Sequence, residues 1–107
     1  MTFININDIK AKEIVPGFWG RFVHSENVTL ASWQVEPGAS LPQHSHPHEQ
    51  VTTLIEGEFE LTIAGETRLL KPGMVAVVPP NVQHSARALT ACQIIDVFYP
   101  VRSEYQN

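Results

Sequence analysis

The chain of 107 residues contains one cysteine, few basic residues and no long hydrophobic run. Cys92 has no cysteine partner within the chain, and its apolar neighbours favour a buried, inert thiol over a nucleophile. We therefore expect a reducing, cytoplasmic environment. The first thirteen residues lack the apolar segment of a signal peptide, and no stretch is long enough to cross a bilayer, so we expect no membrane partner.

The charge balance argues against nucleic-acid binding. Only seven residues are basic, they are scattered from Lys10 to Arg102, and the formal net charge is −4. A phosphate backbone requires a basic stripe, which this chain does not have. The length fits one domain, so we predict a single domain over residues 1–107, with residues 1–27 as an N-terminal arm and the first strands.

Short runs rich in β-branched and aromatic residues, separated by eight prolines and six glycines, indicate an all-β fold. We expect about eight to ten strands in one closed or nearly closed barrel. The clearest predicted strands are residues 28–35, 58–63, 67–70, 75–78, 83–86 and 92–99. The last of these is apolar on both faces, so both should be covered, by sheet packing or by a subunit interface.

The first thirteen residues could add an edge strand or exchange with a second copy of the chain. A two-faced apolar strand and a loose N-terminal arm are typical of barrels that pair with two-fold symmetry. We therefore predict a homodimer.

Three histidines carry the strongest chemical signal. His44 and His46 are separated by one residue, and alternation along a strand sends both side chains to the same face. His84 follows a second turn, after Pro79 and Pro80. Because neutral imidazole is the commonest protein ligand for transition metals, we predict that His44, His46 and His84 hold a divalent ion, which could be Ni, Zn, Fe, Mn or Cu.

The spacing of the residues around these histidines resembles the two motifs of the cupin superfamily. The matching residues are Gly38, His44, His46, Gln50 and Gly57 in the first motif, and Gly73, Pro79 and His84 in the second. This resemblance implies a double-stranded β-helix, or jelly-roll barrel, around a metal. The sequence departs from the family pattern at three positions: Gln50 replaces a glutamate, Asn81 a glycine and Ala88 an asparagine.

Gln50 has the same strand parity as His44 and His46, so its amide oxygen is the expected fourth ligand. Three imidazoles and an amide carry no charge, so a divalent ion would keep a charge of about two. Such a site should attract a small anionic, carboxylate-bearing substrate.

Other neighbours of the predicted ligands leave alternatives open. His48 and Glu49 compete with Gln50 for the fourth position, because His48 shares its parity and Glu49 is an anionic ligand. If they do not bind the metal, His48 and the more distant His24 are expected to be ordinary surface or rim residues.

The C-terminal segment supplies a second set of candidate residues. Asp96 lies inside an apolar strand, where an unpaired charge is costly, so it should face a wet cavity. Phe98 shares its parity, and Arg102 could reach over the mouth of the barrel. In the alternative interpretation, Asp96 is tied to Arg102 for structural reasons and Phe98 belongs to the core.

Most of the chain after Gly38 resembles one cupin group, the pectin-degradation proteins that convert 4,5-unsaturated uronates into linear keto sugars. The matching segments surround His46, Glu56, Lys71, Asn81 and Asp96. The resemblance implies a metal held by His44, His46, Gln50 and His84, with Asp96, Phe98 and Arg102 completing the pocket. It also implies an isomerase-type ring opening of an unsaturated uronate, in which Asp96 transfers a proton, Arg102 binds the carboxylate and Phe98 packs on the sugar.

Two other functions fit the same residues, because cupin barrels carry many activities. One is a dioxygenase or another small-molecule isomerase that uses the histidine cluster. The other is a sensor that binds a sugar or small acid without turnover.

Overall fold

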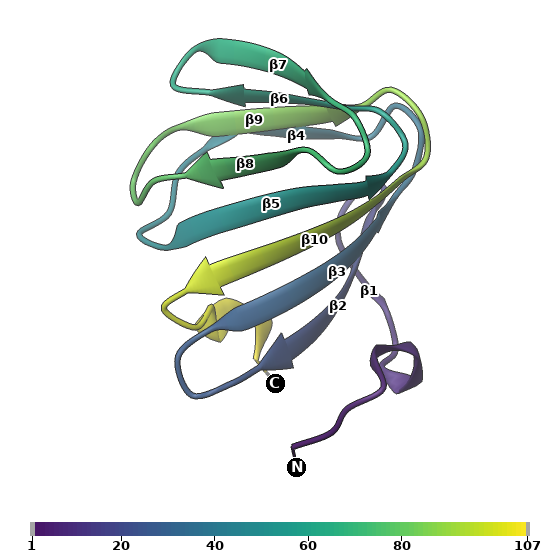
Figure 1. Cartoon of the computed structure of the whole chain (residues 1–107), viewed down its shortest axis with the longest axis vertical. Coiled ribbons are helices and arrows are strands. Elements are labelled where there is room, and N and C mark those ends of the chain that lie inside the picture. The colour runs from purple at the N-terminus through teal and green to yellow at the C-terminus, as the bar shows by residue number, and fades with distance from the viewer. Residues whose placement is uncertain (1, 107) are drawn as a thin grey trace.

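The computed structural model describes residues 2–106 as two antiparallel β-sheets packed face to face (Figure 1). One sheet has six strands in the order β1-β2-β3-β10-β5-β8, and the other has four in the order β4-β9-β6-β7. The elements are η1 (Ile6–Asp8), β1 (Lys12–Val15), β2 (Phe18–His24), β3 (Thr29–Val35), β4 (Ser40–His44), β5 (Glu49–Glu56), β6 (Phe59–Ile63), β7 (Glu66–Leu70), β8 (Val75–Val78), β9 (His84–Ala88), β10 (Cys92–Tyr99) and η2 (Ser103–Tyr105). The predicted all-β fold is confirmed, while the predicted domain limits, residues 1 and 107, lie outside the described residues.

The predicted strands match the observed ones closely, because turn residues mark their ends. The β6–β7 hairpin closes through Ala64 and Gly65, whose φ angles of 50° and 82° are those of a tight two-residue turn. Asn81, which replaces a family glycine, also has a positive φ of 66°. Asparagine tolerates this conformation, so the departure leaves the turn before His84 intact.

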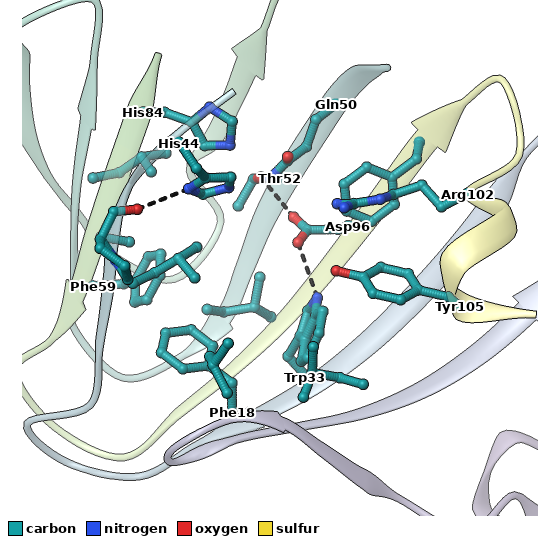
Figure 2. Close-up of a pocket in the computed structure, with 18 of the residues that line it drawn as sticks. Phe18, Trp33, His44, Gln50, Thr52, Phe59, His84, Asp96, Arg102 and Tyr105 are labelled. Carbon is teal, nitrogen blue, oxygen red and sulfur yellow. Dashed lines mark hydrogen bonds between the residues drawn. The ribbon is translucent and has the colours of Figure 1, made fainter. Parts of the chain in front are cut away.

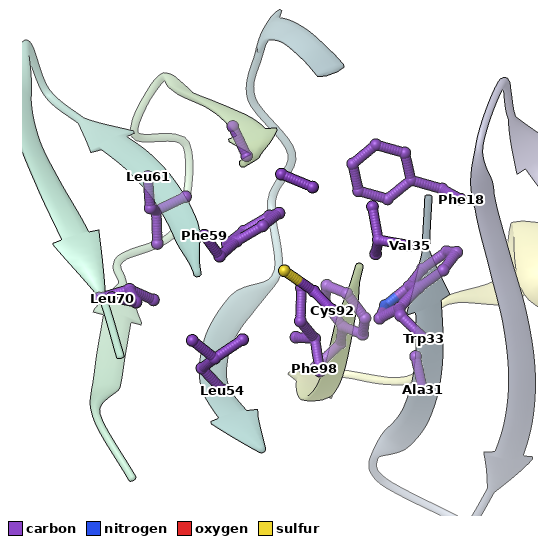
Figure 3. Close-up of a cluster of buried hydrophobic side chains, with 13 residues drawn as sticks. Phe18, Ala31, Trp33, Val35, Leu54, Phe59, Leu61, Leu70, Cys92 and Phe98 are labelled. Carbon is purple, nitrogen blue, oxygen red and sulfur yellow. The ribbon is translucent and has the colours of Figure 1, made fainter. Parts of the chain in front are cut away.

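The hydrophobic core lies between the two sheets (Figure 3). Phe59 and Leu61 point inward from β6, and Phe18, Trp33 and Phe98 point inward from the larger sheet. The rings of Phe18 and Phe59 meet edge to face with centroids 6.5 Å apart, which joins the sheets directly. The alternation of buried and exposed residues along β6 therefore sets which side chains reach the interior.

The prediction for the apolar strand at residues 92–99 is only half right. Ile94 and Phe98 of β10 are buried, whereas Ile95 and Val97 are half-buried and Tyr99 is 56% exposed. The reason is that β10 lies in the middle of the six-stranded sheet, and within residues 2–106 no second layer covers its outer face. Coverage of that face by a partner subunit remains a prediction.

The N-terminal region contributes an edge strand, which was one of the two predicted alternatives; the other was exchange with a second copy of the chain. β1 pairs antiparallel with β2 at the border of the larger sheet, after the single turn of η1. Neither helical turn within residues 2–106 has the length and apolar character needed to cross a lipid bilayer.

Candidate functional site

The three predicted histidines form one cluster, and two of them, His44 and His84, line one end of a cavity between the sheets (Figure 2). His44 is the last residue of β4 and is paired with His84, the first residue of β9, while His46 lies in the following turn. One ligand atom from each imidazole lies within 4.8 Å of the others. Strand pairing thus brings together two sequence segments that are 40 residues apart, from His44 to His84.

Backbone carbonyl oxygens orient the three rings. In every ring Nδ1 lies within hydrogen-bond distance of a backbone carbonyl oxygen, which can only accept. The pairs are His44 with Pro42 at 2.8 Å, His46 with His48 at 3.1 Å and His84 with Val82 at 3.0 Å. In His44 and His84, Nδ1 therefore donates, which leaves a lone pair on Nε2, the arrangement typical of metal-binding histidines. His46 has an acceptor oxygen at both ring nitrogens, the His48 carbonyl at Nδ1 and the Gln50 amide at Nε2.

Two further observations fit a cation at this point. His84 Nε2 is buried and has no hydrogen-bond partner within the described residues. Burial lowers the pKa of His84, and it lowers the pKa of His46 to about 4, with a further contribution from the positive charge of Arg102. Both rings are therefore neutral at pH 7 and available as ligands.

Gln50 presents its amide oxygen to the same point. Its side chain is buried, Oε1 lies 3.0 Å from His46 Nε2, and Nε2 donates to Thr52 Oγ1 at 2.9 Å. His46 Nε2 can donate to the Gln50 oxygen, and with the ring proton on Nδ1 instead, both the Nε2 lone pair and the amide oxygen are available to a cation. Three imidazoles and one amide oxygen form a donor set suited to a divalent transition metal.

Asp96 lies next to this cluster, on β10, and is 7% exposed. Thr52 Oγ1 donates to its Oδ1 at 2.6 Å, and Trp33 Nε1 donates to its Oδ2 at 3.0 Å. Burial raises the pKa of Asp96 to about 6, although the hydrogen bonds from Thr52 and Trp33 act in the opposite direction. Its hydrogen-bond partners are thus Thr52 and Trp33. The alternative interpretation, in which Asp96 is tied to Arg102, is not what the structure shows.

The cavity has a volume of about 420 Å³, a size suited to a small ligand, and the remaining predicted residues line its far end. The Arg102 guanidinium packs against the rings of Phe98 and Tyr105, 4.7 Å and 4.4 Å from their centroids. In Figure 2, Asp96 lies between the histidines at one end and Arg102 and Tyr105 at the other. Phe98 both lines the cavity and belongs to the hydrophobic core.

The expectation of a surface or rim position is wrong for His48 but not for His24. His48 points inward because it shares the parity of His46; it is 8% exposed, and its Nδ1 has no partner within residues 2–106. His24 is half-buried because it holds the C-terminal segment, with its ring nitrogens 2.9 Å from Thr29 Oγ1 and 3.1 Å from the Tyr105 carbonyl oxygen. Glu49 is exposed, on the opposite parity from Gln50.

Among the cavity residues with polar side-chain groups, four were not predicted from the sequence: Trp33, Thr52, Glu104 and Tyr105. Thr52 could have been found, because it is two residues from Gln50 on the same strand and so shares its inward face. Trp33 could not, because its bond to Asp96 depends on the pairing of β3 with β10, across 63 residues of sequence.

The model of the cupin domain matches residues 31–98. The chain belongs to the cupin family. Among curated relatives, this cupin is 30% identical over 83 residues to the pectin degradation protein KdgF of Dickeya dadantii (strain 3937), covering 76% of each chain. It is also 30% identical over 76 residues to the H2HPP isomerase of Bacillus subtilis, covering 70% of this chain but only 32% of that protein.

Solved structures agree with this assignment. KdgF from Halomonas sp. has a TM-score of 0.91 and 28% identity, with 97% of both chains covered. An RmlC-like cupin from Shewanella frigidimarina NCIMB 400 has a TM-score of 0.93 and 27% identity, covering 98% of this chain and 96% of that one. The predicted resemblance to pectin-degradation cupins is therefore confirmed, and the protein is a KdgF homologue.

Proposed function

We propose that this cupin is a metal-dependent enzyme that opens the ring of 4,5-unsaturated uronates and releases linear 5-keto uronates. The observation that carries the proposal is that one cavity contains the imidazole cluster, the buried carboxylate of Asp96 and the guanidinium of Arg102. The similarity to KdgF supports a substrate from pectin breakdown.

His44, His46, His84 and Gln50 would hold the metal, whose identity among Ni, Zn, Fe, Mn and Cu the donor types leave open. When bound, a divalent ion supplies a Lewis acid that polarises the sugar oxygens. Because all four side chains are neutral, they leave the full positive charge to face an anionic substrate. The Nδ1 bonds to backbone carbonyls keep each ring oriented for this task.

The reaction is a balanced isomerisation with two proton transfers. The hydroxyl proton of the cyclic hemiacetal is removed, the bond from the anomeric carbon to the ring oxygen breaks, and the resulting enolate takes up a proton at C4 to give the ketone at C5. Asp96 is the group placed to accept and return the proton, since its pKa of about 6 lies close to neutral pH. Thr52 and Trp33 hold the carboxylate in a fixed orientation during both transfers.

Arg102 and Phe98 would bind the substrate at the other end of the cavity. The guanidinium can donate to the uronate carboxylate, and the ring of Phe98 offers an apolar surface to the sugar.

The proposed activity is tested by adding unsaturated galacturonate to the metal-loaded protein. The absorbance of the conjugated double bond should decay faster than in the spontaneous reaction, and NMR should identify the linear 5-keto uronate as the product. A protein that binds saturated galacturonate but leaves this absorbance unchanged is a sensor, and the proposal is then wrong.

A second candidate is another small-molecule isomerase, which the similarity to H2HPP isomerase favours. That protein is about three times as long as the matched region, since the chain spans 32% of it. Turnover of a cyclic keto acid in place of the uronate would select this candidate. Oxygen consumption with phenols or diketones would instead indicate a dioxygenase.

We also propose that the protein is a homodimer in the cytoplasm, with a second copy against the outer face of the larger sheet. The supporting observation is that Ile55, Val75, Val77 and Tyr99 are each about half exposed on or beside that face. Light scattering at micromolar concentration tests the pairing, and a monomer mass would contradict it.

A further inference from the structure

The carboxylate of Glu104 already occupies one edge of the Arg102 guanidinium. Arg102 Nε donates to Glu104 Oε2 at 2.9 Å, and Arg102 Nη2 donates to the same oxygen at 2.5 Å. Burial acts to raise the pKa of Glu104, but the hydrogen bonds and charge of Arg102 lower it overall. Arg102, the one Lys or Arg among the described residues that line the cavity, is thus paired with an acidic group of its own chain.

Arg102 does not depend on Glu104 for its position. Its side chain is 12% exposed and packs against the rings of both Phe98 and Tyr105. Its backbone N–H donates to Thr29 Oγ1 at 2.8 Å, and His24 holds the carbonyl of Tyr105. The aromatic faces and the backbone bonds fix the guanidinium, whereas Glu104, 49% exposed at the rim, can leave it.

We propose that Glu104 is a specificity-determining residue, whose carboxylate competes with the ligand carboxylate for Arg102. The inference rests on the role of Arg102 as the carboxylate-binding group in the proposed function. With Glu104 in place, the cavity presents a neutralised pair to an incoming anion. A simple carboxylate then gains little at Arg102, while a uronate compensates through the contacts of its hydroxyl groups elsewhere in the cavity.

The competition predicts that Glu104→Gln tightens the binding of carboxylates, because the amide keeps the shape of the side chain and removes its charge. The Kd of the zinc-loaded protein for malonate and for D-galacturonate should fall about 3- to 10-fold at constant ionic strength. D-Galactose, which has no carboxylate, should show no change. Unchanged or weaker binding of both carboxylates, or an equal gain for galactose, overturns the proposal.

NMR offers a readout that does not require turnover. The indole N–H of Trp33 donates to Asp96 inside the cavity, whereas that of Trp19 donates to Glu36 at the outer surface. Binding in the cavity should shift the first signal and leave the second unchanged. Carboxylates that shift neither signal, in both the native protein and Glu104→Gln, overturn the proposal.

The chain contains a matched control for the loss of charge. On β7, Arg68 Nε and Nη2 contact Glu66 Oε2 at 2.8 Å and 2.6 Å, the same geometry two residues apart but away from the cavity. Glu66→Gln should leave all Kd values unchanged, and a gain equal to that of Glu104→Gln would mean that net charge alone is responsible.

A double variant shows whether Arg102 transmits the effect. The gain from Glu104→Gln should vanish when Arg102 is replaced by Met, and a gain that persists refutes competition at Arg102. These results are separable from the proposed reaction, because carboxylate binding can follow the prediction in a protein that never opens a uronate ring. Conversely, turnover with unchanged Kd values would refute only the role of Glu104.

Discussion

The hydroxyl of Thr52 joins the predicted metal ligands to the predicted proton-transfer group: it accepts from the Gln50 amide and donates to Asp96 at 2.6 Å. This orientation requires the Gln50 oxygen to face the imidazoles, where it lies 3.0 Å from His46 Nε2. The same hydroxyl stabilises the ionised form of Asp96. Thr52 thus positions Gln50 toward the metal site and holds Asp96 ready to accept a proton.

Thr52→Val should move the acidic limb of the pH–rate profile upward by about one pH unit. The Thr52 hydrogen bond lowers the pKa of Asp96, so its removal leaves the carboxyl protonated to higher pH and unable to act as a base. The profile of kcat/KM against pH measures the shift. Thr53→Val, one residue away on the half-buried outer face of β5, is the control and should leave the limb in place.

Asp96→Asn should abolish most activity and yet stabilise the metal-free protein at high pH. Burial raises the folded pKa of Asp96 to about 6, above the ordinary value of 3.8, so the folded state binds more protons than the unfolded state between these values. Stability therefore falls as pH rises through this window, and above it the charged carboxylate costs about 2–3 kcal/mol.

Urea unfolding at pH 8, 6 and 4 tests whether the charge of Asp96 destabilises the folded protein. The asparagine variant should be more stable than the native chain at pH 8, and the difference should shrink toward pH 4. A difference that is constant across this range, or one that grows as the pH falls, would show that Asp96 is not destabilised by its burial.

His84→Ala should weaken zinc binding by at least about 100-fold, since it removes the ligand atom that is buried without a partner. Titration against a competing chelator measures the affinity. His24→Ala provides the control, because His24 contacts Thr29 and Tyr105 and lies outside the cluster. Equal zinc affinity in the two variants would rule out the imidazole cluster as the metal site.

Gly57→Ala should destabilise the fold more than Gly38→Ala does. Both glycines have a positive φ, 97° and 81°, so each substitution costs about 1–2 kcal/mol in backbone strain. A Cβ on Gly57 would also lie 2.2 Å from the Ala91 carbonyl oxygen, whereas one on Gly38 would meet nothing within 4 Å. Urea unfolding should show an additional cost of about 2 kcal/mol or more for Gly57→Ala, and equal costs would contradict the packing of this turn.

The local sequence was sufficient to predict the strands and the inward residues of this protein. Turn residues set the hairpin at Ala64 and Gly65, and alternation along β5 puts Gln50 and Thr52 on its inner side. These features depend on neighbours within a few residues, which is why they can be read from one segment at a time. His44, His46 and Gln50 do meet, but not on one strand face as predicted: they lie on β4, in the turn after it and on β5, which belong to facing sheets.

Contacts between distant segments were not predictable in the same way. The partners of Asp96 depend on where β10 lies relative to β3 and β5, and the bonds from Trp33 and Thr52 could not be predicted from its own segment. His48 differs from Asp96 in this respect, because its spacing of two residues from His46 already indicated an inward side chain. The surface expectation there rested on the frequency of exposed histidines and not on the strand geometry.

We propose that a metal held by the imidazole cluster and the carboxylate of Asp96 act together on an unsaturated uronate. The initial rate of absorbance loss with unsaturated galacturonate tests it most directly, when the metal-loaded native protein is compared with His46→Ala and Asp96→Asn. Both variants should fall to within a few-fold of the spontaneous rate, the first because the metal is lost and the second because the proton acceptor is lost. Rates equal to that of the native protein in both variants would contradict the account.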